Sequence, residues 1–159
     1  MKNSFFDQLI TSTQPVTEGS YSVSIVEDTF KYVSKTENYG HKEGEHPFFP
    51  MTLQIEDDGP LNGKTVNITI YMDPDRIDAR KKVLGFLVMG ACGLDVCGSA
   101  TKKDFDIEVP SKVVKFVNKH GDQTFEAKLT RADGRKYWNI FVPREQFSPE
   151  EDTQGQTQL

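Results

Sequence analysis

The sequence predicts a mainly β protein, a five-stranded barrel with a helical connection between its third and fourth strands. Three observations support this. Apolar and polar residues alternate in three segments before residue 73, and such alternation is typical of half-buried strands. The apolar spacing then changes to that of a helix over 75–93. Further along, two short alternating segments flank an Asp-Gly pair, which indicates a β-hairpin.

The first strand is expected over residues 20–33. Tyr21, Val23 and Ile25 share one face, and the alternation breaks near 27–28 before aromatic residues resume it. A strand with a bulge or bend explains this break. The polar, glycine-containing segment 34–46 then predicts a loop.

The second and third strands are expected at 47–57 and 64–72, separated by a turn at 58–63. The alternation in the second strand places Phe49 inward with the other apolar residues of that face. Neighbouring residues of a strand point to opposite faces. Phe48 is therefore expected on the face away from the core.

The helical connection begins at Asp73, which precedes a proline. Aspartate is a favoured N-cap, and proline suits the first position of a helix. Apolar residues at helical spacing then predict a helix near 74–91. We expect Ser111 to cap a second helix over 112–120, which ends before a glycine.

The last two strands are expected at 123–130 and 136–142, joined by a turn at 131–136. Alternation with Ile140 places Trp138 toward the core. Five strands with a helix between the third and fourth match the OB-fold, a small and partly open Greek-key barrel. In that fold the ligand groove crosses strands 2 and 3 and is flanked by two loops, which here correspond to 34–46 and 131–136.

The composition indicates one folded domain. Of 159 residues, 36% are hydrophobic and 11% aromatic, which suffices for a core. We expect an N-terminal lead-in at 1–19, the OB-fold-like domain at 20–143, and an acidic, disordered tail at 144–159. The sequence lacks a run of 18 apolar residues and a secretory signal pattern, and it has two cysteines. These features favour a cytoplasmic protein.

The charge distribution is compatible with a polyanionic ligand, although the net charge is negative. The formal net charge is −5, but much of the negative charge lies at the C-terminal end. Residues 111–136 carry seven Lys and Arg against three Asp and Glu. A near-neutral domain with a basic region can bind nucleic acid locally.

Binding to a single strand needs aromatic side chains for stacking and cations along the backbone path. The aromatic candidates are Tyr32, Tyr39, Phe48, Tyr71 and Tyr137. The candidate phosphate contacts are Lys31, Lys35, Lys42, Lys64, Arg131, Arg135 and Lys136. The competing interpretation for each residue is ordinary: an aromatic that packs in the core, or a solvated surface cation.

Metal binding is weakly indicated. Cys92 and Cys97 are separated by four residues, as are His41 and His46. This leaves a Cys2His2 site open, although structural zinc sites usually show closer pairs. The simpler interpretation is a buried helical Cys92 and a Cys97 without a special role, so we expect no bound metal.

Catalysis is not indicated. The sequence has no nucleotide-binding P-loop motif, no HExxH and no GxSxG. The carboxylates at 56–58 and 73–75 could hold a nuclease metal, but they lie beside a turn and a helix start. Turn and capping roles explain them more simply. We therefore expect neither an enzyme nor a cofactor.

The segments "GSYSVSIVE", "MTLQIEDDGPLNGKTVNITIYM", "ARKKVLGFLVMGACGL" and "ADGRKYWNIFVP" resemble a family of small bacteriophage proteins. These are encoded among recombination and replication genes and are similar to single-stranded DNA-binding OB-fold proteins. The resemblance covers about residues 19–143. It implies binding of single-stranded DNA without strong sequence preference, during phage replication or recombination in the host cytoplasm.

A second function stays open. The same fold and its acidic tail could form a protein-interaction module that recruits or inhibits a nuclease or recombinase. Replication or recombination proteins, and further copies of the chain, are the partners this implies. The sequence does not distinguish DNA from RNA as a ligand.

Overall fold

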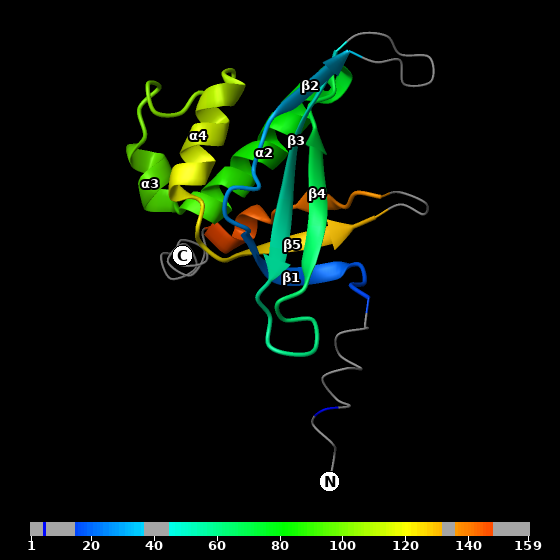
Figure 1. The fold of residues 1–159 in the computed structure, drawn as a ribbon. Helices are drawn as coiled ribbons and strands as arrows, with labels where there is room; N and C mark the ends of the chain where they lie inside the picture. The colour runs from blue at the N-terminus through cyan, green and yellow to red at the C-terminus, as the bar shows by residue number, and fades with distance from the viewer. Residues whose placement is uncertain (1–4, 6–14, 37–44, 132–135, 148–159) are drawn as a thin grey trace, which may run out of the picture.

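The structure is a computed structural model that describes Phe5 and residues 15–36, 45–131 and 136–147 (Figure 1). Six strands form one sheet within these residues: β1 (Gly19–Ile25), β2 (Val33–Thr36), β3 (Glu45–Ile55), β4 (Thr65–Tyr71), β5 (Phe125–Thr130) and β6 (Asn139–Phe141). The helical elements are η1 (Pro74–Arg76), α2 (Ile77–Cys92), α3 (Leu94–Ser99), α4 (Pro110–His120) and η2 (Arg144–Phe147). Helices and strands take comparable shares of the chain, so the fold is mixed α/β and not mainly β as predicted.

Strand β3 organises the sheet, and all strand pairings around it are antiparallel. β4 pairs along one edge of β3, with Phe48 opposite Tyr71 and Leu53 opposite Val66. β1 and β2 pair with the two ends of the other edge. The inward positions of β3 are buried as the alternation predicts, since Phe49, Met51, Leu53 and Ile55 are at most 3% exposed.

The predicted first strand is divided in two. β1 ends at Ile25 and β2 begins at Val33, but the backbone between them stays beside β3, where the Lys31 N–H donates to the Pro50 carbonyl. Asp28 takes a φ of 63°, a left-handed conformation that aspartate tolerates better than most residues. The interruption directs Phe30 into the core, where it is fully buried.

The other side of the sheet is completed after the helices. β5 pairs with β1, and β6 pairs with β5, both antiparallel. The described ends of the sheet then meet at one parallel bridge between Ile68 and Trp138. There the Trp138 N–H donates to the Asn67 carbonyl (2.9 Å) and the Thr69 N–H donates to the Trp138 carbonyl (3.3 Å). One bridge does not close the sheet into the predicted barrel, because β6 is three residues long.

The connection after β4 is helical, as predicted. The Asp73 carboxylate accepts from the Asp75 N–H at 3.0 Å, so Asp73 is the N-cap of η1, which leads directly into α2. The second predicted helix is present as α4, but its N-cap is Val109 and Ser111 lies inside the helix. Pro110 explains this difference, because a proline suits the first helical position. The short helix α3 was not predicted.

Helix α2 packs closely on the sheet at Gly90. A Cβ placed on Gly90 would lie 2.8 Å from Cγ of the Phe125 ring, whereas a Cβ on Gly85 would meet nothing within 4 Å. Phe125 is buried, and the clash is with the part of the ring nearest its backbone. The close approach of α2 to β5 therefore requires glycine at position 90.

Gly90→Ala and Gly85→Ala should consequently change stability in opposite directions. Overpacking against Phe125 should cost about 1–3 kcal/mol at position 90. At position 85 the better helix propensity of alanine should stabilise by about 0.5–1 kcal/mol. Chemical denaturation of the two variants measures both effects. A stabilising Gly90→Ala would show that the helix does not lie this close to β5.

The folded part of the chain extends past the predicted boundary at 143, to at least Phe147. The ring of Phe147 stacks on Phe86, with centroids 6.1 Å apart. The Gln146 side-chain amide accepts from the Glu126 N–H and donates to the Glu126 carbonyl, each at 2.9 Å. Among the described residues, no helix is long and apolar enough to cross a membrane.

Candidate nucleic-acid interface

The two phenylalanines at the start of β3 have separate positions, as the sequence predicts. Phe49 is 2% exposed and stacks on Phe30, with ring centroids 5.5 Å apart. Phe48 lies on the opposite, outer face and is half-buried. It is directly opposite Tyr71 in the β3–β4 pairing, and their ring centroids are 5.8 Å apart. We call Phe48 and Tyr71 the aromatic pair.

Tyr71 supplies the open part of the aromatic pair, because 43% of it is exposed. Asn67 and Thr52 lie further along the same outer face and are hydrogen-bonded to each other at 3.1 Å. The pair therefore borders a polar, uncharged surface of β3 and β4. This arrangement offers ring surface to a flat ligand without opening the core.

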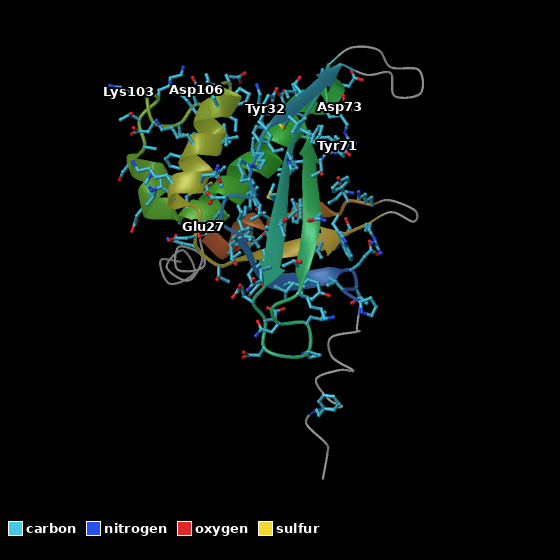
Figure 2. The ribbon with its side chains drawn as sticks, viewed as in Figure 1. Glu27, Tyr32, Tyr71, Asp73, Lys103 and Asp106 are labelled. Carbon is cyan, nitrogen blue, oxygen red and sulfur yellow. The ribbon has the colours of Figure 1, made fainter. Side chains whose placement is uncertain are left out.

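Tyr32 does not join the aromatic pair. Its ring contacts Phe49, with centroids 5.0 Å apart, and 37% of the residue is exposed. Figure 2 shows Tyr71 to the right of β4 and Tyr32 to the left of β3, toward α4. Tyr32 partly covers the core and is a separate exposed ring.

The start of β6 brings further candidates next to β4. Trp138 is 6% exposed, which confirms its predicted core position, and its bridge to Ile68 fixes this segment beside β4. The Arg131 guanidinium lies 4.8 Å from the centre of the Trp138 ring. Lys136 lies over Tyr137, with Nζ 5.6 Å from the ring centre. Both cations are exposed, as is 40% of Tyr137.

The remaining candidate cations are dispersed. Lys31 is exposed and lies beside β3, since its backbone is bonded to Pro50. Lys64 precedes β4 at the end away from Tyr71, and seven residues of strand separate the two by about 23 Å. Lys64 is therefore too far away to assist binding at the aromatic pair directly. The structure describes the backbone of Lys35, opposite His46, whereas Tyr39, Lys42 and Arg135 lie outside the described residues.

The outer face of the sheet becomes acidic away from the aromatic pair. Ser22 donates to the Glu126 carboxylate at 2.7 Å, and Ser24 donates to the Glu56 carboxylate at 3.0 Å. Gln54 also donates to Glu56. These carboxylates would repel phosphates. Lys128 also lies on this face, opposite Ser20 and Phe141, so a polyanion would meet charges of both signs there, whereas the surface around Phe48 and Tyr71 carries none of these carboxylates.

The cysteines are held as thiols. Burial, followed by the proximity of Cys97 and Asp122, raises the pKa of Cys92 to about 12. Burial also raises the pKa of Cys97, whose thiol faces the Val88 carbonyl at 3.7 Å. Thiolates are the nucleophilic and metal-binding form, so neither residue is prepared for that chemistry at neutral pH. The part of the chain that the structure describes contains no group of three or more potential metal-binding His, Cys, Asp or Glu residues.

The acidic segments have structural roles. Asp73 caps η1, and Asp57 accepts from the Ser22 N–H at 2.8 Å, which ties the β3–β4 turn to β1. Gly59 and Gly63 take positive φ values in this turn. Asp73 therefore has a capping role and Asp57 a role in holding the turn.

Sequence reasoning missed a lysine-lined cavity on the helical side of the protein. It counted Lys112, Lys115 and Lys119 in the basic stretch 111–136, but it did not place them together. Their spacing of three and four residues puts them on one face of α4. That spacing was the available signal. The contribution of Lys103 depends on tertiary structure and had no local signal.

The sequence matches no family model and no curated protein. The resemblance to phage single-stranded DNA-binding proteins therefore stays a prediction.

Proposed function

We propose that this protein binds single-stranded DNA without strong sequence preference, in phage replication or recombination. The observation that carries the proposal is the aromatic pair on the outer face of β3 and β4, with Tyr71 43% exposed. Every base has a π-face, so stacking on such rings tolerates any sequence. The pair supplies a place for bases while the core beneath it stays closed.

Cations on both sides of the aromatic pair support a strand that crosses it. Lys31 lies along the β3 edge, where its backbone bonds Pro50, two residues from Phe48. Arg131 and Lys136 lie on the β4 side, where Trp138 bridges Ile68. A backbone that passes from one edge to the other would meet positive charge at each end, while its bases face the rings.

The arrangement of the sheet supports an OB-like interpretation. β3 lies between β1 and β4, β5 lies between β1 and β6, and the segment before β6 returns to β4 in parallel. The main helical connection lies between β4 and β5. An OB-fold has this order and is itself partly open, with its oligonucleotide site on strands 2 and 3. Those two strands correspond to β3 and β4.

Fluorescence anisotropy with labelled oligonucleotides tests the proposal. Unrelated single strands of about 20 nucleotides, longer than one OB-fold usually covers, should bind with similar affinity. For two to four phosphate contacts, affinity should fall about 5- to 50-fold between 50 and 200 mM salt. A matched duplex should bind more weakly, because its bases cannot reach the rings. Absence of binding at low salt, or equal binding of the duplex, would contradict the proposal.

The acidic part of the outer face favours a second candidate, a protein-interaction module that recruits or inhibits a nuclease or recombinase. Glu56 and Glu126 are each fixed by a serine hydroxyl, which gives a defined negative surface suited to a basic protein partner. A purified recombination nuclease should then bind the protein without any oligonucleotide. Replacing Glu126 with glutamine should weaken that complex, and no change in its affinity would rule out this face.

A further inference from the structure

A cavity of about 710 Å³ opens between α3, the segment that follows it, and α4. Lys103, Lys112, Lys115 and Lys119 line it, together with the apolar residues Val96 and Phe116. We call this cavity the lysine pocket. It lies away from the aromatic pair: α3 and α4 are to the left of α2 in Figure 1, and β4 is to its right. Its size is within the range of small-ligand sites.

The lysines converge from separate elements. Three follow one face of α4 over seven residues, a length of about 10 Å. The fourth, Lys103, comes from the segment after α3, and Figure 2 shows it beyond α4 at the far left. The floor is rigid and aromatic, because the Phe116 ring packs against Phe105 at 5.2 Å and His120 at 4.9 Å.

Helix stability does not explain the lysines in the first half of α4. The N-terminal end of a helix carries partial positive charge, so cations there are unfavourable. Yet Lys112 lies in the first turn of α4, Lys115 follows in the next, and the first turn contains no acidic residue. The Lys112 ammonium is bonded to the Lys102 carbonyl at 3.2 Å, which fixes the wall of the pocket. Lys115 has no comparable structural role in the described contacts.

The charge inside the pocket is unbalanced. Asp95 and Asp104 also line it. The Asp104 carboxylate accepts from the Thr101 N–H (3.2 Å) and hydroxyl (3.1 Å). These hydrogen bonds, and then Lys119 and Lys103, hold the pKa of Asp104 below its usual range. With four ammonium groups and two carboxylates, the described lining of the pocket has a formal excess of two positive charges.

We propose that the lysine pocket binds a phosphate group. A terminal phosphate carries about two negative charges, which matches the excess of two, and two adjacent phosphodiesters of a nucleic-acid strand carry the same total charge. The planar fork of arginine recognises both carboxylate and phosphate, and lysine is also a common phosphate ligand, which it binds as a point charge. None of the described residues that line the pocket is an arginine. The phosphate comes either from a nucleic-acid backbone or from a free organic phosphate.

Calorimetric titration of the full chain with inorganic tripolyphosphate tests the site directly. Lys115→Gln/Lys119→Gln should weaken binding about 10-fold or more, because charge-assisted contacts are lost. The matched control is Arg76→Gln/Lys82→Gln, which removes two exposed cations of η1 and α2 outside the pocket. The control should change the affinity less than about 2-fold, since exposed charges at a distance are screened. Both variants should melt like the parent.

The same variants identify the source of the phosphate. If Lys115→Gln/Lys119→Gln also weakens oligonucleotide binding, the phosphate belongs to the strand. If it weakens the binding of dATP and tripolyphosphate alone, the ligand is a free organic phosphate. Tyr71→Ala should leave tripolyphosphate affinity unchanged, so the pocket and the aromatic pair are tested separately. Absence of tripolyphosphate binding, an equal loss in the control, or preferential binding of a glutamate-rich peptide would overturn the proposal.

Discussion

Phe48→Ala should weaken the binding of single-stranded oligonucleotides about 5- to 150-fold, because one stacked base is worth roughly 1–3 kcal/mol. Tyr71→Ala should have an effect of similar size, since the two rings lie 5.8 Å apart and present one surface. Fluorescence anisotropy at fixed low salt measures the affinity. A thermal melt of the same samples shows that the protein remains folded.

Phe141→Ala provides the matched control for the aromatic pair. Phe141 is 57% exposed and also lies on the outer face of the sheet, but on β6, opposite Lys128. Its removal should change oligonucleotide affinity less than about 2-fold, since one distant ring adds no stacked base. If Phe48→Ala instead lowers the melting temperature and leaves affinity intact, Phe48 serves packing alone. That result would contradict the assignment of the aromatic pair on β3 and β4 as the nucleic-acid interface.

Ile68→Ala should reduce the free energy of unfolding by roughly 2–4 kcal/mol, and Leu53→Ala by a similar amount. Both residues are fully buried, on adjacent strands β4 and β3. Truncation of either removes buried methyl groups and leaves a cavity. Ile68 also pairs with Trp138 where the two ends of the sheet meet, so its cavity opens where the sheet has least backbone pairing. Urea denaturation measures the loss.

Thr65→Ala is the control on the same strand, because Thr65 is exposed at the start of β4. Its effect should stay within about 0.5 kcal/mol, the usual range for surface substitutions. Equal denaturation midpoints for Ile68→Ala and the parent would place Ile68 on the surface. Such equal midpoints would also contradict the assignment of the Ile68 face of β4 to the core.

The strands and the main helix could be predicted because each has a local signal. The alternation around Phe49 and Ile68 reports which face of a strand is buried. Asp73 followed by Pro74 marks the point where the chain changes to a helix. Asp133 and Gly134 predict a turn between the last two strands, and they lie outside the described residues. In each case a few adjacent residues decide the conformation, and tertiary contacts agree with them.

The sequence indicates an interruption between β1 and β2 but not its form. The alternation of apolar and polar residues breaks at Glu27 and Asp28, and a one-residue bulge would break it in the same way as the longer excursion that the structure contains. The left-handed backbone of Asp28 is allowed because the excursion buries Phe30 and bonds the Lys31 N–H to β3. These contacts are long-range. The openness of the sheet likewise depends on how far β6 runs beside β4, which no local pattern specifies.

In the candidate site, too, some features follow from local sequence patterns and others depend on long-range contacts. Opposite faces for Phe48 and Phe49 follow from the period of a strand, and the register places Tyr71 opposite Phe48. The sequence predicts Lys64 and Tyr71 in one binding site, but they lie at opposite ends of β4, about 23 Å apart. The sequence predicts Tyr32 within a continuous strand, whereas the excursion after β1 turns its ring against Phe49. The lysine pocket needs Lys103 and α4 to meet across segments, which is a tertiary event.

The Gln146 side chain has a further consequence for how the molecule behaves among its own copies. β6 pairs with β5 from Lys128 onward, which leaves the backbone of Glu126 on that edge without a strand neighbour. An exposed N–H and carbonyl at a sheet edge are a template for pairing with another chain. Gln146 occupies both groups with its amide and is itself fixed by the Pro143 carbonyl at 2.8 Å. One side chain thus occupies both backbone groups at this position, and neither group is left open for edge-to-edge pairing with another chain.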